Sequence, residues 1–98
     1  MKTPEGFEKD EIKKYLKSIG AYFISPMTFG YGKSGGADIV ACIDGTFWSI
    51  EVKREGKEPT ALQNARIRAV QEAGGMTAWG TAEKVLHHIR AWRHKGMR

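Results

Sequence analysis

A tight turn near the middle of the chain constrains the fold more than any other feature. Asp44-Gly45 separates two stretches of β-branched and aromatic residues, which cover residues 39–43 and 46–53. This arrangement favours a two-residue β-turn, because both turn positions require a positive φ that Asp and Gly tolerate. We therefore predict an antiparallel hairpin in which Ala41 lies opposite Trp48.

Alternation along this hairpin separates two faces of different character. The apolar face, which we expect to join the core, comprises Ile39, Ala41, Ile43, Trp48, Ile50 and Val52. The other face comprises Asp38, Val40, Cys42, Phe47, Ser49, Glu51 and Lys53. The register places Asp38 opposite Glu51, with Cβ atoms about 4.5 to 5.5 Å apart. Two acids at that separation repel each other, whereas their oxygens would bind Mg²⁺ or Mn²⁺ and so remove the repulsion.

The remaining elements follow from the spacing of apolar residues. Spacings of three and four predict helices over residues 7–19, 60–73 and 82–94. Strand-forming residues predict a strand over 21–29, at a sheet edge or bulged because of its proline, and another over 76–79. The order is helix, strand, hairpin, helix, strand, helix. This order predicts a mixed α/β fold with one small sheet flanked by helices.

Size and composition restrict the class of protein. A chain of 98 residues allows one domain over residues 1–98, because a separate core needs on the order of 100 residues. No segment resembles a membrane span or a secretion signal, so we expect a protein that is neither secreted nor in a membrane. The one cysteine, Cys42, favours a reducing compartment, which is the cytoplasm. The net charge of +5 permits a polyanionic partner.

Two motifs resemble a known family. Gly36-Ala37-Asp38, a hairpin and then Glu51-Val52-Lys53 resemble the PD-(D/E)XK nuclease signature, with Ala37 in place of a proline that supplies only backbone shape. Gln63 on the following helix resembles the additional Gln of the virus-type replication-repair nuclease (VRR-NUC) branch. That branch is related to archaeal Holliday junction resolvases and has small stand-alone members in phages. The resemblance covers Glu8 through Trp79.

The resemblance implies a fold, a place and a reaction. The fold would be a restriction-endonuclease-like αβββαβ core, to which the helix over 82–94 is an addition. The place would be the cytoplasm of a bacterial or phage-infected cell. The reaction would be the Mg²⁺-dependent endonucleolytic hydrolysis of DNA, with Mn²⁺ as a substitute. Asp38, Glu51 and the main-chain carbonyl of Val52 would hold the metal. Lys53 would orient the water or stabilise the transition state, and Gln63 would position Lys53 or the phosphate.

The family often uses a glutamate of its first helix as a further metal ligand. Glu8 lies about 30° from the centre of the apolar stripe of that helix and Glu11 about 90° away, at 100° per residue. We therefore prefer Glu8 to Glu11 as a metal ligand. Glu8 has an alternative role in the first helical turn, where the helix dipole favours a carboxylate. Gln63 also has one, because Thr60 and Gln63 fit a capping box.

The DNA-binding surface is predicted from basic and loop residues. The candidates for phosphate contacts are Lys13, Lys17, Lys33, Ser34 and Arg66, and Lys33 is alternatively a solvated loop charge. No element for reading base sequence is evident, which favours recognition of branched DNA by shape. Because resolving a four-way junction takes two incisions, the resolvase-like hypothesis predicts a twofold homodimer. Its interface would contain Trp79, Trp92 and the last helix. The alternative hypotheses are a non-catalytic DNA-binding or assembly module and a nickase or exonuclease subunit that needs a partner.

Overall fold

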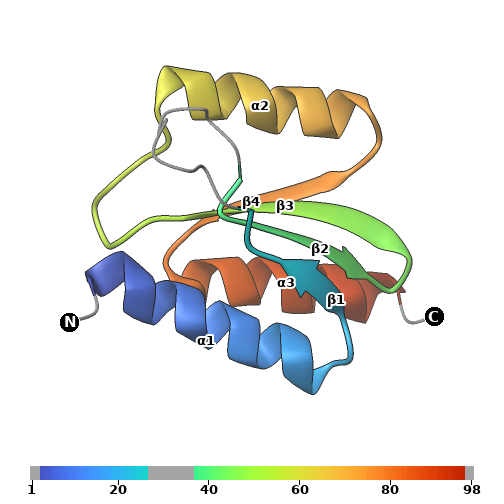
Figure 1. Ribbon diagram of the computed structural model, residues 1–98. Coiled ribbons are helices and arrows are strands. Elements are labelled where there is room, and N and C mark those ends of the chain that lie inside the picture. Colours follow the sequence, from blue (N-terminus) through green and yellow to red (C-terminus); the bar gives the residue numbers. More distant parts are fainter. Residues whose placement is uncertain (1–2, 27–36, 97–98) are drawn as a thin grey trace.

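The computed structural model describes residues 3–26 and 37–96. A four-stranded mixed sheet separates α2 on one face from α1 and α3 on the other (Figure 1). The elements are α1 (Pro4–Ser18), β1 (Tyr22–Ile24), β2 (Ile39–Ile43), β3 (Thr46–Val52), α2 (Ala61–Glu72), β4 (Met76–Gly80) and α3 (Ala82–Gly96). The predicted mixed α/β fold with one small sheet and an additional last helix is confirmed.

The predicted hairpin forms the centre of the sheet. Asp44 has φ 49° and Gly45 has φ 81°, as the tight turn requires. The β2–β3 ladder pairs Ala41 with Trp48, which confirms the predicted register. The strand order is β1-β2-β3-β4, with β1 and β2 antiparallel and β3 and β4 parallel. The two hairpin strands therefore lie between β1 and β4.

The first strand lies at a sheet edge, as predicted, but it is shorter than expected. It ends at Ile24, whereas the sequence pattern extended it to residue 29. Pro26 has no N–H to donate to a ladder, and the hydroxyl of Ser25 donates to the Asp38 carbonyl at 2.9 Å. The rest of the predicted extension, residues 27–29, lies outside the described residues.

The core lies between the sheet and the layer formed by α1 and α3. The helices contribute Ile12, Leu16, Ala82, Val85, Leu86 and Ile89, and the hairpin contributes the six apolar residues predicted from its alternation. Trp48 is fully buried and meets the ring of Trp92 edge to face, with centroids 5.3 Å apart. Trp92 is thus partly used for the core. Among residues 3–26 and 37–96, no helix is long and apolar enough to cross a membrane.

The helix on the opposite face packs less closely. None of the α2 residues is buried, although Leu62 and Val70 are apolar. A groove of about 750 Å³ runs between this helix and the sheet, with Phe47 among its lining residues. Polar contacts hold both ends of α2, including one from the Gln71 side-chain amide to the Thr77 hydroxyl at 3.1 Å. This face therefore leaves room for polar groups near the sheet.

The turn geometry makes a stability prediction. No atom lies within 4 Å of a Cβ built on Gly45, so Gly45→Ala meets no steric clash and is penalised only by its positive φ. We expect the substitution to lower the free energy of unfolding by about 1 to 2 kcal/mol, measured by urea denaturation. Gly96→Ala is the control, because Gly96 has open space and no positive φ. Equal stability of the two variants would contradict the turn assignment.

Candidate active site

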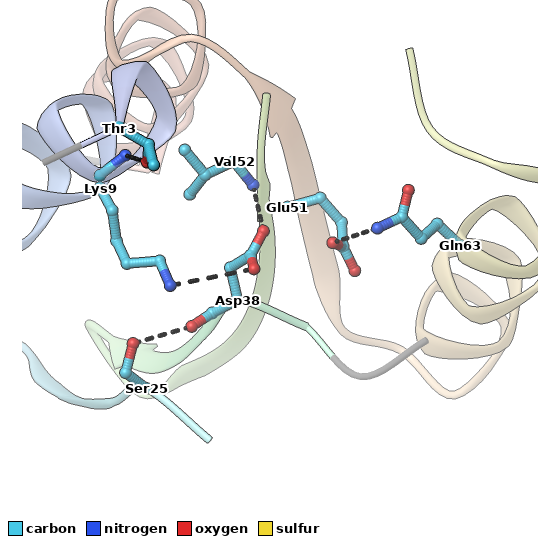
Figure 2. Close-up of polar contacts among 8 residues, drawn as sticks. Thr3, Lys9, Ser25, Asp38, Glu51, Val52 and Gln63 are labelled. Carbon is cyan, nitrogen blue, oxygen red and sulfur yellow. Dashed lines mark hydrogen bonds and ion pairs between the residues drawn. The ribbon is translucent and has the colours of Figure 1, made fainter. Parts of the chain in front are cut away.

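Asp38 is held by backbone groups of the hairpin. It directly precedes β2, and its N–H donates to the Ile50 carbonyl at 3.0 Å. Its Oδ2 accepts from the Val52 N–H at 2.7 Å, a short charge-assisted hydrogen bond that Figure 2 shows. With the Ser25 hydroxyl on its carbonyl, Asp38 is fixed at both its main chain and its side chain.

The structure corrects one detail of the predicted acid pair. The β2–β3 ladder ends at Ile39 and Ile50, so Asp38 is not a ladder partner of Glu51. Beyond that end the Val52 N–H has no partner in the β2–β3 ladder, and it donates to the Asp38 carboxylate instead. In Figure 2 the Asp38 carboxylate points toward Val52, whereas that of Glu51 points toward Gln63. The two acids share one end of the hairpin without facing each other directly.

Glu51 is the unusual group of this site. The residue is only 1% exposed, and its Oε2 is buried with no hydrogen-bond partner among the described residues. The pKa of Glu51 is raised from 4.5 to about 7, mainly because burial disfavours the charged form and further because Asp38 repels it. The charges of Lys53 and Arg66 lower this pKa and so oppose the shift. A buried carboxylate with an unpartnered oxygen is costly unless a cation or a proton compensates it.

Gln63 forms the capping box that the sequence offered as one alternative, and it also contacts Glu51, a partner that the sequence did not indicate. Its side-chain carbonyl accepts from the Thr60 N–H at 2.9 Å, and the Thr60 hydroxyl accepts from the Gln63 N–H at 3.1 Å. This capping box fixes the orientation of the amide, because its oxygen is engaged on the helix side. Its Nε2 donates to Glu51 Oε1 at 3.2 Å. Gln63 thus connects the start of α2 to the buried carboxylate.

Glu8, the predicted further metal ligand, contacts the start of α3. It is half-buried and its Oε1 accepts from the Ala82 N–H at 2.7 Å, whereas Glu11 is exposed. The helical geometry thus identified the inward-facing acid, and that acid caps the start of α3. The α1 residue that contacts Asp38 is Lys9, whose Nζ lies 3.9 Å from Asp38 Oδ1. Sequence spacing gave no signal for this contact.

The other predicted residues are distributed around this site. Lys53 is half-buried and its N–H donates to the Gly80 carbonyl at 2.8 Å, which fixes its backbone beside β4. Arg66 is exposed on α2 and lies close enough for its charge to act on Glu51. On α1, Lys13 is half-buried and Lys17 exposed. Lys33 and Ser34 lie outside the described residues.

The donor set suits a hard divalent cation with few protein ligands. Within residues 3–26 and 37–96, no group of three or more His, Cys, Asp or Glu side chains could hold a metal. Asp38 and Glu51 remain, and the unpartnered Oε2 of Glu51 is the feature that fits a cation. Mg²⁺ tolerates such a sparse set, because it keeps several waters and takes only one or two carboxylates.

The raised pKa of Glu51 makes a prediction about pH. Because the folded-state pKa exceeds the unfolded value, the folded protein keeps a proton that the unfolded chain releases between pH 4.5 and about 7. Stability should therefore fall by roughly 3 kcal/mol as the pH rises through that window, with no further loss above it. Glu51→Gln should remove this component, as measured by urea denaturation from pH 5 to 8. Glu11→Gln, at an exposed site, should retain it; equal pH profiles for both variants would contradict the assignment.

The double role of Gln63 makes a second prediction. Gln63→Glu keeps an acceptor for the Thr60 N–H but places a second carboxylate where the amide donates to Glu51. We expect Gln63→Glu to melt at a lower temperature than wild type at pH 8. At pH 5 the difference from wild type should be smaller, because the two acids share a proton. Thr60→Ala is the control: relative to wild type at the same pH, it should lose about 1 kcal/mol by breaking the cap, and this loss should be the same at pH 5 and pH 8. Wild-type stability of Gln63→Glu at pH 8 would mean that Gln63 only caps the helix.

Comparison with known proteins supports the fold. No family model and no curated protein matches the sequence. Among solved structures, the chain is similar to one described as "VRR_NUC domain", with a TM-score of 0.75 and 23% sequence identity. The alignment covers 90% of this chain and 96% of that one. At this identity the similarity establishes the fold, in which a small mixed four-stranded sheet carries three helices.

Proposed function

We propose that this protein is a metal-dependent nuclease that hydrolyses phosphodiester bonds in DNA. The observation that carries this proposal is the buried Glu51 carboxylate, whose Oε2 has no partner among the described residues, at the same hairpin end as Asp38 and Lys53. A buried carboxylate with an unpartnered oxygen does not stabilise the fold. A role in metal binding or catalysis therefore explains the position of Glu51 better than a structural role does. The fold shared with a VRR_NUC domain supports the same conclusion.

The residues of the site divide the work of hydrolysis. Asp38, Glu51 and the main-chain carbonyl of Val52 would hold Mg²⁺ or Mn²⁺. When bound, the metal supplies a water of lowered pKa and neutralises charge on the scissile phosphate. The Lys53 ammonium would stabilise the negative charge that develops on the phosphate oxygens. Gln63 holds Glu51 in a fixed orientation through the 3.2 Å hydrogen bond, which is a positioning role.

We further propose that the substrate is branched DNA and that the protein acts as a homodimer. The net charge of +5 favours a polyanion, and phosphate contacts provide affinity without reading sequence. Lys13, Lys17 and Arg66 lie on the two helices α1 and α2, on opposite faces of the sheet, so they could follow separate duplex arms. Two symmetric incisions on a junction require two sites, which a twofold dimer supplies.

A non-catalytic DNA-binding module is the alternative that the structure also supports. The described residues offer two carboxylates rather than three, and Asp38 already accepts from Val52 and lies near Lys9. Such a module would bind DNA equally well with and without a divalent metal. Metal dependence of cleavage therefore separates the two functions.

The test is cleavage of a panel of labelled DNAs: four-way junction, splayed arm, flap, plain duplex and single strand. We expect incision in Mg²⁺ or Mn²⁺ and none in EDTA. Lys53→Ala should reduce the rate by about 10²-fold or more, because it removes a stabilising cation from the transition state. Lys57→Ala is the matched control, since Lys57 is an exposed lysine in the next loop and should keep wild-type activity.

Each outcome has a distinct meaning. Paired symmetric cuts confined to the four-way junction would support a resolvase, whereas cuts at other substrates would support a nuclease of another specificity. Binding without incision in either metal would overturn the proposed activity in favour of the DNA-binding module. Equal loss of activity in Lys53→Ala and Lys57→Ala would show that Lys53 contributes only general charge.

A further inference from the structure

Two neighbouring residues of α1 point to different parts of the structure. Glu8 reaches the start of α3, where its Oε1 accepts from the Ala82 N–H at 2.7 Å. Lys9, one residue further along the helix, extends toward Asp38, with Nζ 3.9 Å from Oδ1 (Figure 2). The contact of α1 with Asp38 is therefore made by a cation, Lys9.

The contact of Glu8 gives that carboxylate a structural use. A carboxylate at a helix N-terminus is favoured by the helix dipole, and it satisfies an N–H that lacks an intrahelical partner. The start of α3 thus compensates part of the charge of Glu8. The role as a metal ligand that the sequence suggested for Glu8 stays a prediction, which the Glu8→Gln variant below tests.

The contact of Lys9 is of a different kind. Lys9 and Asp38 are about one-third exposed, at 33% and 35% of their side-chain surface, and their charged atoms are 3.9 Å apart. Ion pairs of this exposure contribute little to stability, so Lys9 is free to exchange one anionic partner for another. Asp38 is held independently of Lys9, because its Oδ2 accepts from Val52 at 2.7 Å. The oxygen that faces Lys9 is therefore the one that changes partner at little cost to the fold.

We propose that Lys9 is a substrate-binding residue that couples metal binding to DNA binding, an inference that rests on the proposed nuclease function. Without DNA, the Lys9 ammonium neutralises Asp38 and repels a divalent cation that approaches Oδ1. When a DNA phosphate arrives, the ammonium moves to a phosphate oxygen and leaves Oδ1 to the metal. Metal and DNA thus each strengthen the binding of the other, as linkage requires.

The test measures binding rather than cleavage. A Lys53→Ala protein serves as the parent, so that bound DNA is not cut during the measurement. Mg²⁺ affinity is measured by calorimetric titration of the free protein, and affinity for a labelled four-way junction by fluorescence anisotropy in EDTA and in Mg²⁺. Lys9→Ala is added to the parent, with Lys14→Ala as the matched control, because Lys14 is an exposed lysine of the same helix. Circular dichroism checks that each variant is folded.

We expect Lys9→Ala to bind Mg²⁺ about two- to fivefold more tightly without DNA, because a competing charge is removed. Mg²⁺ should also raise the DNA affinity of Lys9→Ala less than it raises that of the parent. The two increases should again differ by about two- to fivefold. Lys14→Ala should keep the parent's Mg²⁺ affinity and the parent's increase in DNA affinity on adding Mg²⁺. Lys9→Arg should restore both parent values, since it keeps the charge. Glu8→Gln should leave Mg²⁺ affinity unchanged, because the amide oxygen still accepts from Ala82.

The outcomes distinguish failure of this inference from failure of the proposed function. If the parent binds Mg²⁺ but Lys9→Ala and Lys14→Ala behave alike, the role of Lys9 is overturned and the nuclease proposal stands. Weaker Mg²⁺ binding by Lys9→Ala would also overturn that role. If the parent binds no Mg²⁺ and its DNA affinity is the same in EDTA, both the proposed function and the coupling are wrong.

Discussion

The carboxylate of Glu51, buried in the sheet face beneath α2, is the constraint around which the site is arranged. An acid that is 1% exposed, with one oxygen unpartnered, raises the free energy of the folded state unless its charge is compensated. The chain provides partial compensation by one hydrogen bond from Gln63 and by the positive charges of Lys53 and Arg66. The pKa of about 7 shows that this compensation is incomplete. A divalent cation would supply the positive charge that is still missing.

The rest of the fold makes such a group tolerable by dividing its two faces. Stability comes from the layer between the sheet, α1 and α3, where Trp48, Ile50 and the core residues of the helices are buried. The other face carries no comparable core, because α2 has no buried residue. Polar and charged side chains on that face therefore do not interrupt hydrophobic packing. The same division explains how Glu51 and Ser49 are buried polar residues between apolar ones along β3.

Most of the fold could be predicted from the sequence because it depends on local rules. The positive φ required at Asp44 and Gly45 fixes the hairpin, and period two then separates the core face from the site face. Two details could not be predicted, since both depend on what happens where a ladder or helix ends. Asp38 accepts from the Val52 N–H because β2 begins only at the next residue, Ile39, and Glu8 accepts from the N–H of Ala82, a residue 74 positions away. For Gln63, the sequence indicated the capping box but not the contact with Glu51, and the two ends of one amide make both contacts.

Charge balance links these features to the proposed substrate. Cations act on both carboxylates of the site: Lys9 lies 3.9 Å from Asp38, and the charges of Lys53 and Arg66 lower the pKa of Glu51. A divalent cation bound by the two carboxylates would supply the charge that Glu51 lacks, but it would leave the cationic side chains around them in excess. Several phosphates arriving together would remove this excess, whereas a small neutral or singly charged molecule would not. The site as built therefore favours a polyanion, such as the proposed DNA substrate, as the companion of the proposed metal ion.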